Sequence, residues 1–175
     1  FAMRTDYVKQ LAFVQRELGF KCVRFHGVFC DDMNTVYSFS DILNFPNTSK
    51  FVEKAFHRVG LVYDNVLSCG MKPFVELGFM PNLLAKEKNN SKSFYGANFN
   101  MPKNMDDWTD HVASFIHYLI DRYGIEEVST WYFEVWNEPD LENMFFNGTQ
   151  KDYFNLYKAT VETIKGIDAR LLVGG

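Results

Sequence analysis

The sequence predicts an α/β protein that forms part of a (β/α)8 TIM barrel, about its strands 2 to 5 with the intervening helices. Three observations lead to this prediction. Helical and strand-like segments alternate strictly along the 175 residues, which is typical of parallel strands joined by helices. No G-x-G-x-x-G or G-x-x-x-x-G-K motif follows a strand, which excludes the nucleotide-binding forms of the competing open sheet. Only four strands are expected, whereas a full barrel has eight strands and about 250 residues.

The first predicted elements are a helix over 5–18 and a strand over 22–26. Thr5 and Asp6 can cap the helix, and Gly19 can end it. Because a helix precedes the first strand, the chain is expected to enter the barrel after the barrel's own first strand.

A long segment over 27–50, rich in Asp, Asn, Ser and Thr, predicts a loop. Helical periodicity resumes over 51–68, and Gly70 follows as a stop signal. Residues 72–77 predict the second strand, and 81–107 a second long loop. The two longest loops therefore follow the carboxyl ends of the first two strands, on the face where barrels build their binding sites.

The clearest helix is expected over 108–123, because its apolar residues follow the 3.6-residue period and Gly124 can end it. The apolar and aromatic segment 131–135 predicts a buried strand that is interrupted only by Glu134.

The last helix is expected to begin at Thr149 and to run to about residue 165. Thr149-Gln-Lys-Asp152 resembles a capping box in which Asp replaces the usual Glu or Gln. Residues 171–173 begin a fourth strand, which completes the alternation.

The composition narrows the possible functions. The formal net charge is −4, from 18 Lys and Arg against 22 Asp and Glu, so no nucleic-acid partner is expected. No run of about 18 apolar residues is present, so no membrane-spanning helix is expected either. Aromatic residues make up 17% of the chain, which suits a large core and also pockets that stack on sugar rings.

The cysteines and the glycosylation triplets indicate what to expect of disulfides, metal sites and cellular location. Cys22, Cys30 and Cys69 are odd in number and lack metal-ligand spacing, so neither a disulfide framework nor a metal site is expected. Reduced thiols favour the cytoplasm. The location stays open, because N-x-S/T triplets that are common by chance also occur, at Asn47, Asn89 and Asn147.

The sharpest functional signal is Asn137-Glu138-Pro139, which follows the third strand. Functional groups of parallel barrels lie at the carboxyl ends of their strands. A carboxyl group there, beside Trp136 and fixed by Pro139, is expected to be partly desolvated, as the acid of a glycosidase must be. The preceding amide could donate to a sugar hydroxyl. The alternative is a helix-initiating turn without chemistry.

Three further residues are candidates for substrate binding. Glu76 ends the second strand and His26 ends the first, although His26 could equally be a structural histidine. Trp136 is the one member of its aromatic segment that is expected near a ligand, because barrel strands are covered on both faces. The other histidines fall on predicted helices and are expected to serve surface or packing roles: His57, His111 and His117.

These residues lie in segments that resemble glycoside hydrolase family 39, the family of β-xylosidases and α-L-iduronidases. The matching segments extend over nearly the whole chain: 23–29 with 31–33, 70–77 with 79–81, 122–128, 131–139 and 172–175. Their order along the chain is far more specific than the Asn-Glu-Pro tripeptide alone.

The resemblance implies a retaining, exo-acting glycosidase on a (β/α)8 barrel, with a carbohydrate substrate and no cofactor. By matching position, Glu138 would be the general acid/base, Asn137 would contact the sugar 2-hydroxyl, and His26 would line the sugar-binding subsite. The segments around Glu76 and Trp136 are more similar to xylosidases, so β-xylosides are the expected substrates. Asp140, which iduronidases also carry, keeps α-L-iduronides open as the alternative.

The family's nucleophile is a second Glu on the seventh barrel strand, whereas this chain is expected to end at about the fifth. We therefore expect 1–175 to be a partial catalytic domain, truncated at both ends and inactive by itself. Glu76 is expected to serve the pocket wall or hydrogen bonding. Two alternatives stay open: a non-catalytic carbohydrate-binding remnant, and a half-barrel whose sheet edges pair between copies as a homo-oligomer.

Overall fold

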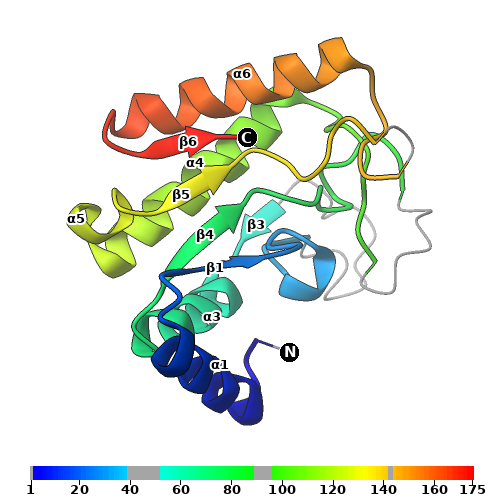
Figure 1. Ribbon diagram of the computed structural model, residues 1–175. Coiled ribbons are helices and arrows are strands. Elements are labelled where there is room, and N and C mark those ends of the chain that lie inside the picture. The colour runs from blue at the N-terminus through cyan, green and yellow to red at the C-terminus, as the bar shows by residue number, and fades with distance from the viewer. Residues whose placement is uncertain (1, 39–51, 89–95, 142–143) are drawn as a thin grey trace.

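The computed structural model describes residues 2–38, 52–88, 96–141 and 144–175 as an arrangement of helices around a parallel sheet (Figure 1). The helices are α1 (Thr5–Leu18), the 3-10 helix η1 (Asp31–Met33), α3 (His57–Ser68), α4 (Met105–Tyr123), α5 (Ile125–Val128) and α6 (Gln150–Ile167). The strands are β1 (Cys22–Phe25), β2 (Val36–Ser38), β3 (Val52–Lys54), β4 (Lys72–Glu76), β5 (Tyr132–Glu134) and β6 (Leu172–Gly174).

The main sheet has four parallel strands in the order β1-β4-β5-β6. Arg24, Phe74, Tyr132 and Leu172 stand opposite one another across it. Spatial order follows chain order without reversal, and a helix joins each strand to the next, so the predicted α/β class is confirmed. Among the described residues the sheet stays open, with β1 and β6 at its edges.

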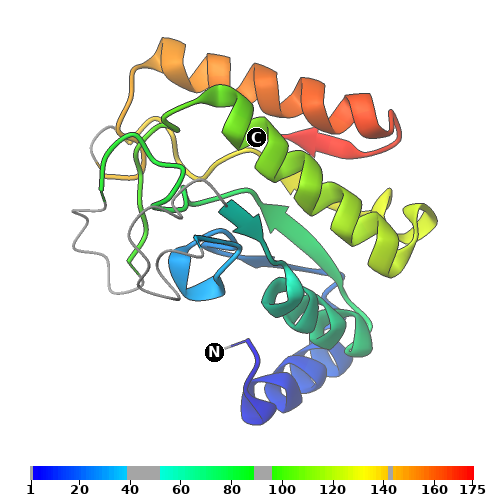
Figure 2. The ribbon, with the colours of Figure 1, turned by 180° about the vertical axis from the view of Figure 1, so that it is seen from behind.

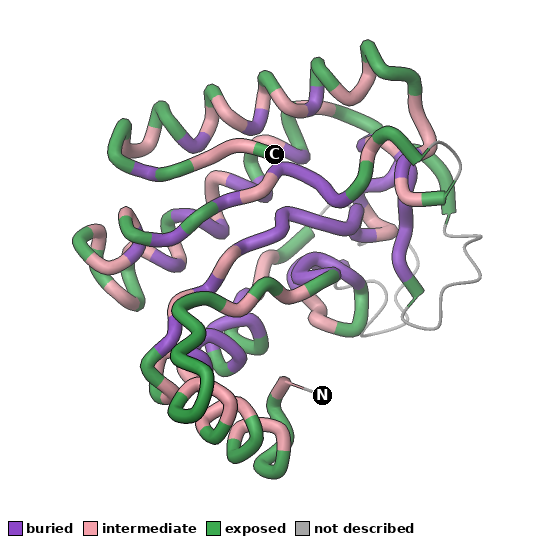
Figure 3. Tube along the Cα trace, viewed as in Figure 1, coloured by how far each residue is buried: buried purple, intermediate pink, exposed green. Residues whose placement is uncertain are grey.

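The two faces of the sheet differ sharply. Val75 and Phe133 point to the face covered by helices and are 0% and 2% exposed. Figure 2, seen from behind, shows α4 crossing in front of this face. Tyr132 and Leu172 point the other way and are 49% and 41% exposed. Figure 3 shows buried residues along β4 and in the segments after β4 and β5, whereas α1 has no buried residue.

The region after β1 differs from the prediction. Val52–Lys54 is a strand, β3, that pairs antiparallel with β2, so the helix predicted over 51–68 begins only at His57. Lys54 fastens this hairpin to α4, because its ammonium group contacts the Asp110 carboxylate and donates to Ser114 Oγ at 2.9 Å. The loop predicted over 27–50 contains η1 and β2 in its first half, and its second half, 39–50, lies outside the described residues.

Capping side chains set the boundaries of the later helices. Asn104 Oδ1 accepts a hydrogen bond from the backbone N–H of Asp106 at 3.0 Å, so α4 begins three residues earlier than its apolar pattern predicts. The predicted capping box of α6 is confirmed: Thr149 Oγ1 accepts from the Asp152 N–H, and the Asp152 carboxylate accepts from the Thr149 N–H.

A buried hydrogen bond joins α4 to α6 behind the sheet. Trp108 Nε1 donates to Thr160 Oγ1 at 2.8 Å, and both side chains are 0% exposed. The Trp108 ring also contacts Trp136, with ring centroids 6.3 Å apart. The helix pair therefore supports the segment that follows β5.

Candidate active site

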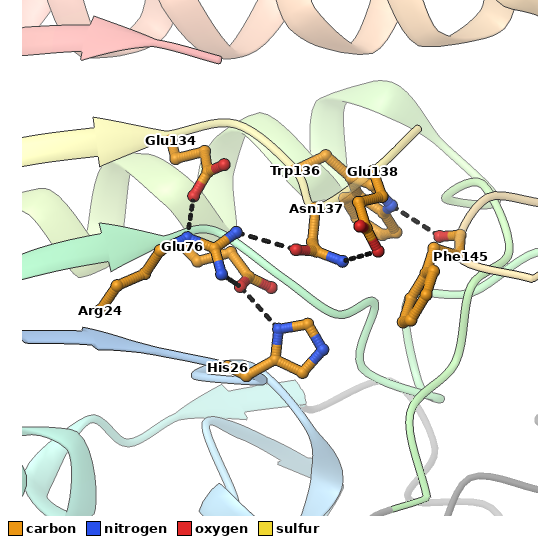
Figure 4. A network of polar contacts seen from close by, with 8 residues as sticks. All are labelled: Arg24, His26, Glu76, Glu134, Trp136, Asn137, Glu138 and Phe145. Carbon is orange, nitrogen blue, oxygen red and sulfur yellow. Dashed lines mark hydrogen bonds and ion pairs between the residues drawn. The ribbon is translucent and has the colours of Figure 1, made fainter. Parts of the chain in front are cut away.

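The candidate site lies at the carboxyl ends of β1, β4 and β5 (Figure 4). His26 follows β1 directly, Glu76 is the last residue of β4, and Asn137 and Glu138 lie in the segment after β5. Neighbouring strands lie about 4.8 Å apart, so side chains from adjacent strand ends can reach one another. The structure thus brings together candidates that are far apart in the sequence.

Glu76 forms the buried base of the site. Its side chain is 0% exposed, and Oε2 contacts His26 Nδ1 at 2.8 Å and Arg24 Nη1 at 3.1 Å. Oε1 is also buried and has no hydrogen-bond partner in the structure. Removing a lone charge from water costs several kcal/mol. The buried Glu76 carboxylate therefore requires cationic or N–H partners.

His26 presents one edge of its ring to the site. An ionised carboxylate can only accept, so the contact with Glu76 places a proton on His26 Nδ1 and directs Nε2 away from the strand. The ring packs edge-on against Phe79, with centroids 4.9 Å apart, and lies 6.0 Å from the Phe145 ring. Figure 4 shows it pointing from the end of β1 toward Phe145. Sugar binding by His26 stays a prediction.

Arg24 is a site residue that the sequence pattern did not single out. Its Nε donates to Glu134 Oε2 at 2.6 Å and its Nη2 to Asn137 Oδ1 at 2.8 Å, while Nη1 pairs with Glu76. The hydrogen bond to Glu134 raises the pKa of Arg24, and the charges of Glu76, Glu134 and Glu138 act in the same direction against the effect of burial. The available signal was its position two residues before His26, because alternate strand residues share a face.

Asn137 and Glu138 lie side by side, but in different surroundings. Asn137 is 7% exposed, and its Nδ2 donates to Glu138 Oε2 at 3.3 Å. Glu138 is exposed, so the partial desolvation expected for it is not found among the described residues. Its backbone φ of 45° lies in the left-handed region, which costs a non-glycine residue about 1 kcal/mol. In this conformation the Glu138 carboxyl group lies beside the Asn137 amide.

Trp136 is buried rather than open to a ligand. Trp136 is 1% exposed, and its indole Nε1 donates to the Phe145 carbonyl at 2.8 Å. The ring lies against Phe79 and Phe146, with centroid distances of 5.4 and 5.8 Å. This geometry favours packing beneath the site, and the predicted contact of Trp136 with a sugar has no support from it.

A row of amide side chains links the loops after β1, β4 and β5. We call it the amide row. Each member donates to the next: Asn147 Nδ2 to Asn100 Oδ1 at 3.1 Å, Asn100 Nδ2 to Asn98 Oδ1 at 2.9 Å, Asn98 Nδ2 to Asn82 Oδ1 at 2.6 Å, and Asn82 Nδ2 to the Asp31 carboxylate. Because a carboxylate only accepts, Asp31 fixes the direction of every amide in the row. The three loops around the site therefore share one hydrogen-bonded support.

Other groups considered from the sequence lie apart from the site. His57 and His117 are exposed on helices, whereas His111 is buried in α4. Cys22, Cys30 and Cys69 are free thiols. Within the described ranges no group of three or more His, Cys, Asp or Glu side chains could hold a metal ion. None of the helices in those ranges combines the length and apolarity needed to cross a membrane.

The sequence of this chain is similar to those of known glycosyl hydrolases. A family model described as glycosyl hydrolases family 39 matches residues 1–175. A β-xylosidase of Caldicellulosiruptor saccharolyticus is 41% identical over 174 residues, which cover 99% of this chain and 34% of the relative. A β-xylosidase of Geobacillus stearothermophilus is 36% identical over 174 residues, which cover 99% of this chain and 33% of the relative.

The fold of this chain is also similar to that of a solved structure. The GH39 β-xylosidase of Caulobacter crescentus superimposes with a TM-score of 0.87 at 37% sequence identity. The match covers 99% of this chain and 37% of the other chain. This chain therefore spans about a third of the length of the relatives that it matches.

Proposed function

This chain belongs to glycoside hydrolase family 39, and we propose that it is the part of a (β/α)8 catalytic domain that carries the acid/base side of a retaining β-xylosidase. One observation carries the proposal. An exposed carboxyl group, Glu138, lies beside the Asn137 amide at the carboxyl end of a parallel sheet, where His26 also contacts the buried Glu76. The site thus offers a proton donor next to an amide, with an imidazole nearby, and both groups can bind hydroxyls.

Glu138 is the proposed general acid and base. In the first step it would give its proton to the glycosidic oxygen as the bond from that oxygen to the anomeric carbon breaks and a second carboxylate attacks that carbon. In the second step it would take a proton from water, whose oxygen then displaces the enzyme carboxylate. Its exposure leaves room for the leaving group, and a bound sugar would supply the desolvation that the free site lacks.

The proposed nucleophile lies outside the described residues. A retaining enzyme needs its second carboxyl about 5–5.5 Å from the acid, with access to the sugar. Glu76 is fully buried and bonded to Arg24 and His26, so it cannot attack a substrate. Glu134 ends β5 and its carboxylate is paired with Arg24. Both serve better as fixed charges of the pocket than as nucleophiles.

We propose β-xylosides, cleaved from a chain end, as the substrates. The two β-xylosidase relatives that align with nearly the whole chain support this choice. Asp140 in the exposed segment after Glu138 keeps α-L-iduronides as the alternative substrates. Kinetics of the complete protein on xylobiose and on an aryl α-L-iduronide would separate the two.

The acid role is tested by Glu138→Ala in the complete protein that contains this chain. On xylobiose, whose leaving group needs protonation, the rate should fall about 100- to 10,000-fold. On a nitrophenyl β-xyloside the first step should fall much less, because nitrophenolate leaves without a proton. Asp140→Ala is the matched control, since it removes a neighbouring exposed carboxylate. Equal losses on both substrates, or the same pattern in the control, would count against Glu138 as the acid.

A further inference from the structure

The Asn137 side chain has two ends of opposite chemistry, and its orientation decides which end meets a substrate. Oδ1 accepts hydrogen bonds, whereas Nδ2 donates them. Arg24 Nη2 lies 2.8 Å from Oδ1, and Glu138 Oε2 lies 3.3 Å from Nδ2. A guanidinium has only donors and an ionised carboxylate only acceptors, so the two neighbours require the same orientation of the amide.

Arg24 is itself fixed by side chains from two other strands. Its Nε bonds to Glu134 on β5 at 2.6 Å, and its Nη1 pairs with Glu76 on β4 at 3.1 Å. Glu76 is fully buried and Glu134 is 22% exposed, so both carboxylates have little freedom. The guanidinium is planar, so fixing two of its nitrogens also fixes the third, Nη2, on Asn137. A lysine ammonium group, with one nitrogen, could not serve all three acceptors.

We propose that Arg24 is the positioning residue that turns the N–H end of Asn137 toward Glu138 and the bound sugar. The inference rests on the proposed function, because it needs a sugar beside Glu138. Arg24 acts through Asn137 and not by touching substrate. With the amide in this orientation, Nδ2 can donate to the hydroxyl next to the anomeric carbon. With the amide reversed, Oδ1 would face the Glu138 carboxylate, and two acceptors would oppose each other.

The kinetic test compares a β-xyloside with its 2-deoxy analogue in the complete protein. In Arg24→Lys, which keeps the charge beside Glu76, kcat/KM on the xyloside should fall about 10- to 100-fold, and on the 2-deoxy analogue less than about threefold. Asn137→Ala should show the same discrimination. The double variant should be no worse than Asn137→Ala alone, because both changes remove one interaction. Equal losses on the two substrates, or additive losses in the double variant, would overturn the inference.

Arg122→Lys is the matched control. Arg122 also bonds to a carboxylate, that of Asp64, but it joins α4 to α3 away from the site. Arg122→Lys should leave the ratio of kcat/KM on the xyloside to kcat/KM on the 2-deoxy analogue unchanged. A change of that ratio in Arg122→Lys equal to the change in Arg24→Lys would mean that any lost guanidinium pair alters the site, and would overturn the specific role.

A second readout does not depend on hydrolysis. In the 175-residue chain, the NMR signals of the Asn137 NH2 group should shift as Glu138 ionises, and this response should vanish in Glu138→Gln. The response should also be lost in Arg24→Lys. If it persists there, the amide orientation does not depend on Arg24 and the inference is wrong. If it is lost while the complete protein hydrolyses no glycoside, the positioning role stands and the proposed function fails.

Discussion

His111 is a buried histidine whose surroundings favour its neutral form. Its ring is 0% exposed and packs against Phe29, with centroids 4.6 Å apart; Nδ1 has no hydrogen-bond partner in the structure. Burial lowers the pKa of His111 to about 3; the charge of Lys54 acts in the same direction and that of Asp110 opposes it. Unfolding would expose the ring to water, where it takes up a proton far more readily.

The stability of the chain should therefore depend on pH through His111. The pKa is lower in the folded state than its ordinary 6.5, so between about pH 6.5 and 3 the unfolded state binds the extra proton. The free energy of unfolding should fall as pH falls through this window, by at most about 1.4 kcal/mol per pH unit from this one group. Urea unfolding at pH 7, 6 and 5 measures the slope.

The histidine responsible is identified by two matched variants on the same helix. His111→Gln should flatten the slope between pH 6.5 and 5, whereas His117→Gln, which changes an exposed position of α4, should not. The same slope in wild type and His111→Gln would show that His111 does not cause the acid sensitivity.

The strand ends allowed most of the candidate site to be predicted at the residue scale. Glu76 ends β4, His26 directly follows β1, and Asn137 and Glu138 lie in the segment after β5; the structure brings His26 to Glu76 and Asn137 to Glu138. Arg24 could not be predicted, because its partners depend on which residues face one another across three strands. The sequence also could not show that the Trp136 ring turns into the core, or that Glu138 is exposed.

At the scale of elements, the helices that flank a strand decide whether the sequence reveals it. The four strands of the parallel sheet were predicted because each follows a helical segment with clear periodicity. The β2–β3 hairpin was missed because β2 lies in a segment rich in Asp, Asn, Ser and Thr, and β3 is followed closely by the helical pattern of α3. The single turn of α5 was also missed, because it is too short to show a helical period. Lys54 and its contacts with α4, not local propensity, explain why the hairpin lies where it does.

The buried hydrogen bond between α4 and α6 gives a prediction about stability. Thr160 and Thr163 on α6 both donate to a carbonyl four residues earlier, but only Thr160 also accepts from the indole of Trp108. Thr160→Val should lower the free energy of unfolding by about 1–3 kcal/mol, because it leaves a buried N–H without a partner. Thr163→Val should cost less than about 1 kcal/mol. Urea unfolding followed by circular dichroism compares them, and equal costs would show that the indole contact contributes nothing.

At the scale of the whole molecule, the described residues present the candidate site at one end of an open sheet. One sheet face is covered by helices, while Tyr132 and Leu172 leave the other exposed in the described part of the chain. Sheet edges at β1 and β6 are where pairing between copies would occur, and a homo-oligomer of this kind stays a prediction. The candidate site carries Glu138, and its two strand carboxylates, Glu76 and Glu134, are both paired with Arg24.

The isolated 175-residue chain should therefore not turn over an activated aryl β-xyloside. A retaining glycosidase needs two carboxylates, and Glu76 is bound to Arg24 and His26 in a buried position. Release of nitrophenol by the purified chain should not exceed that of its Glu138→Ala variant. Repeated turnover with retained configuration that disappears in Glu76→Ala would instead place both catalytic carboxylates within these residues.

The amide row has a consequence for how the protein is produced. Asn147 begins an N-x-T triplet, and its Nδ2, the atom to which a secretory host would attach a glycan, is the first donor of the row. The backbone N–H of Asn147 also bonds to the Phe99 carbonyl at 2.8 Å, so the two loops meet closely at this point. A branched oligosaccharide added there before folding would lie between them. Expression in a host without N-glycosylation keeps that contact, and with it the shared support of the loops around the site.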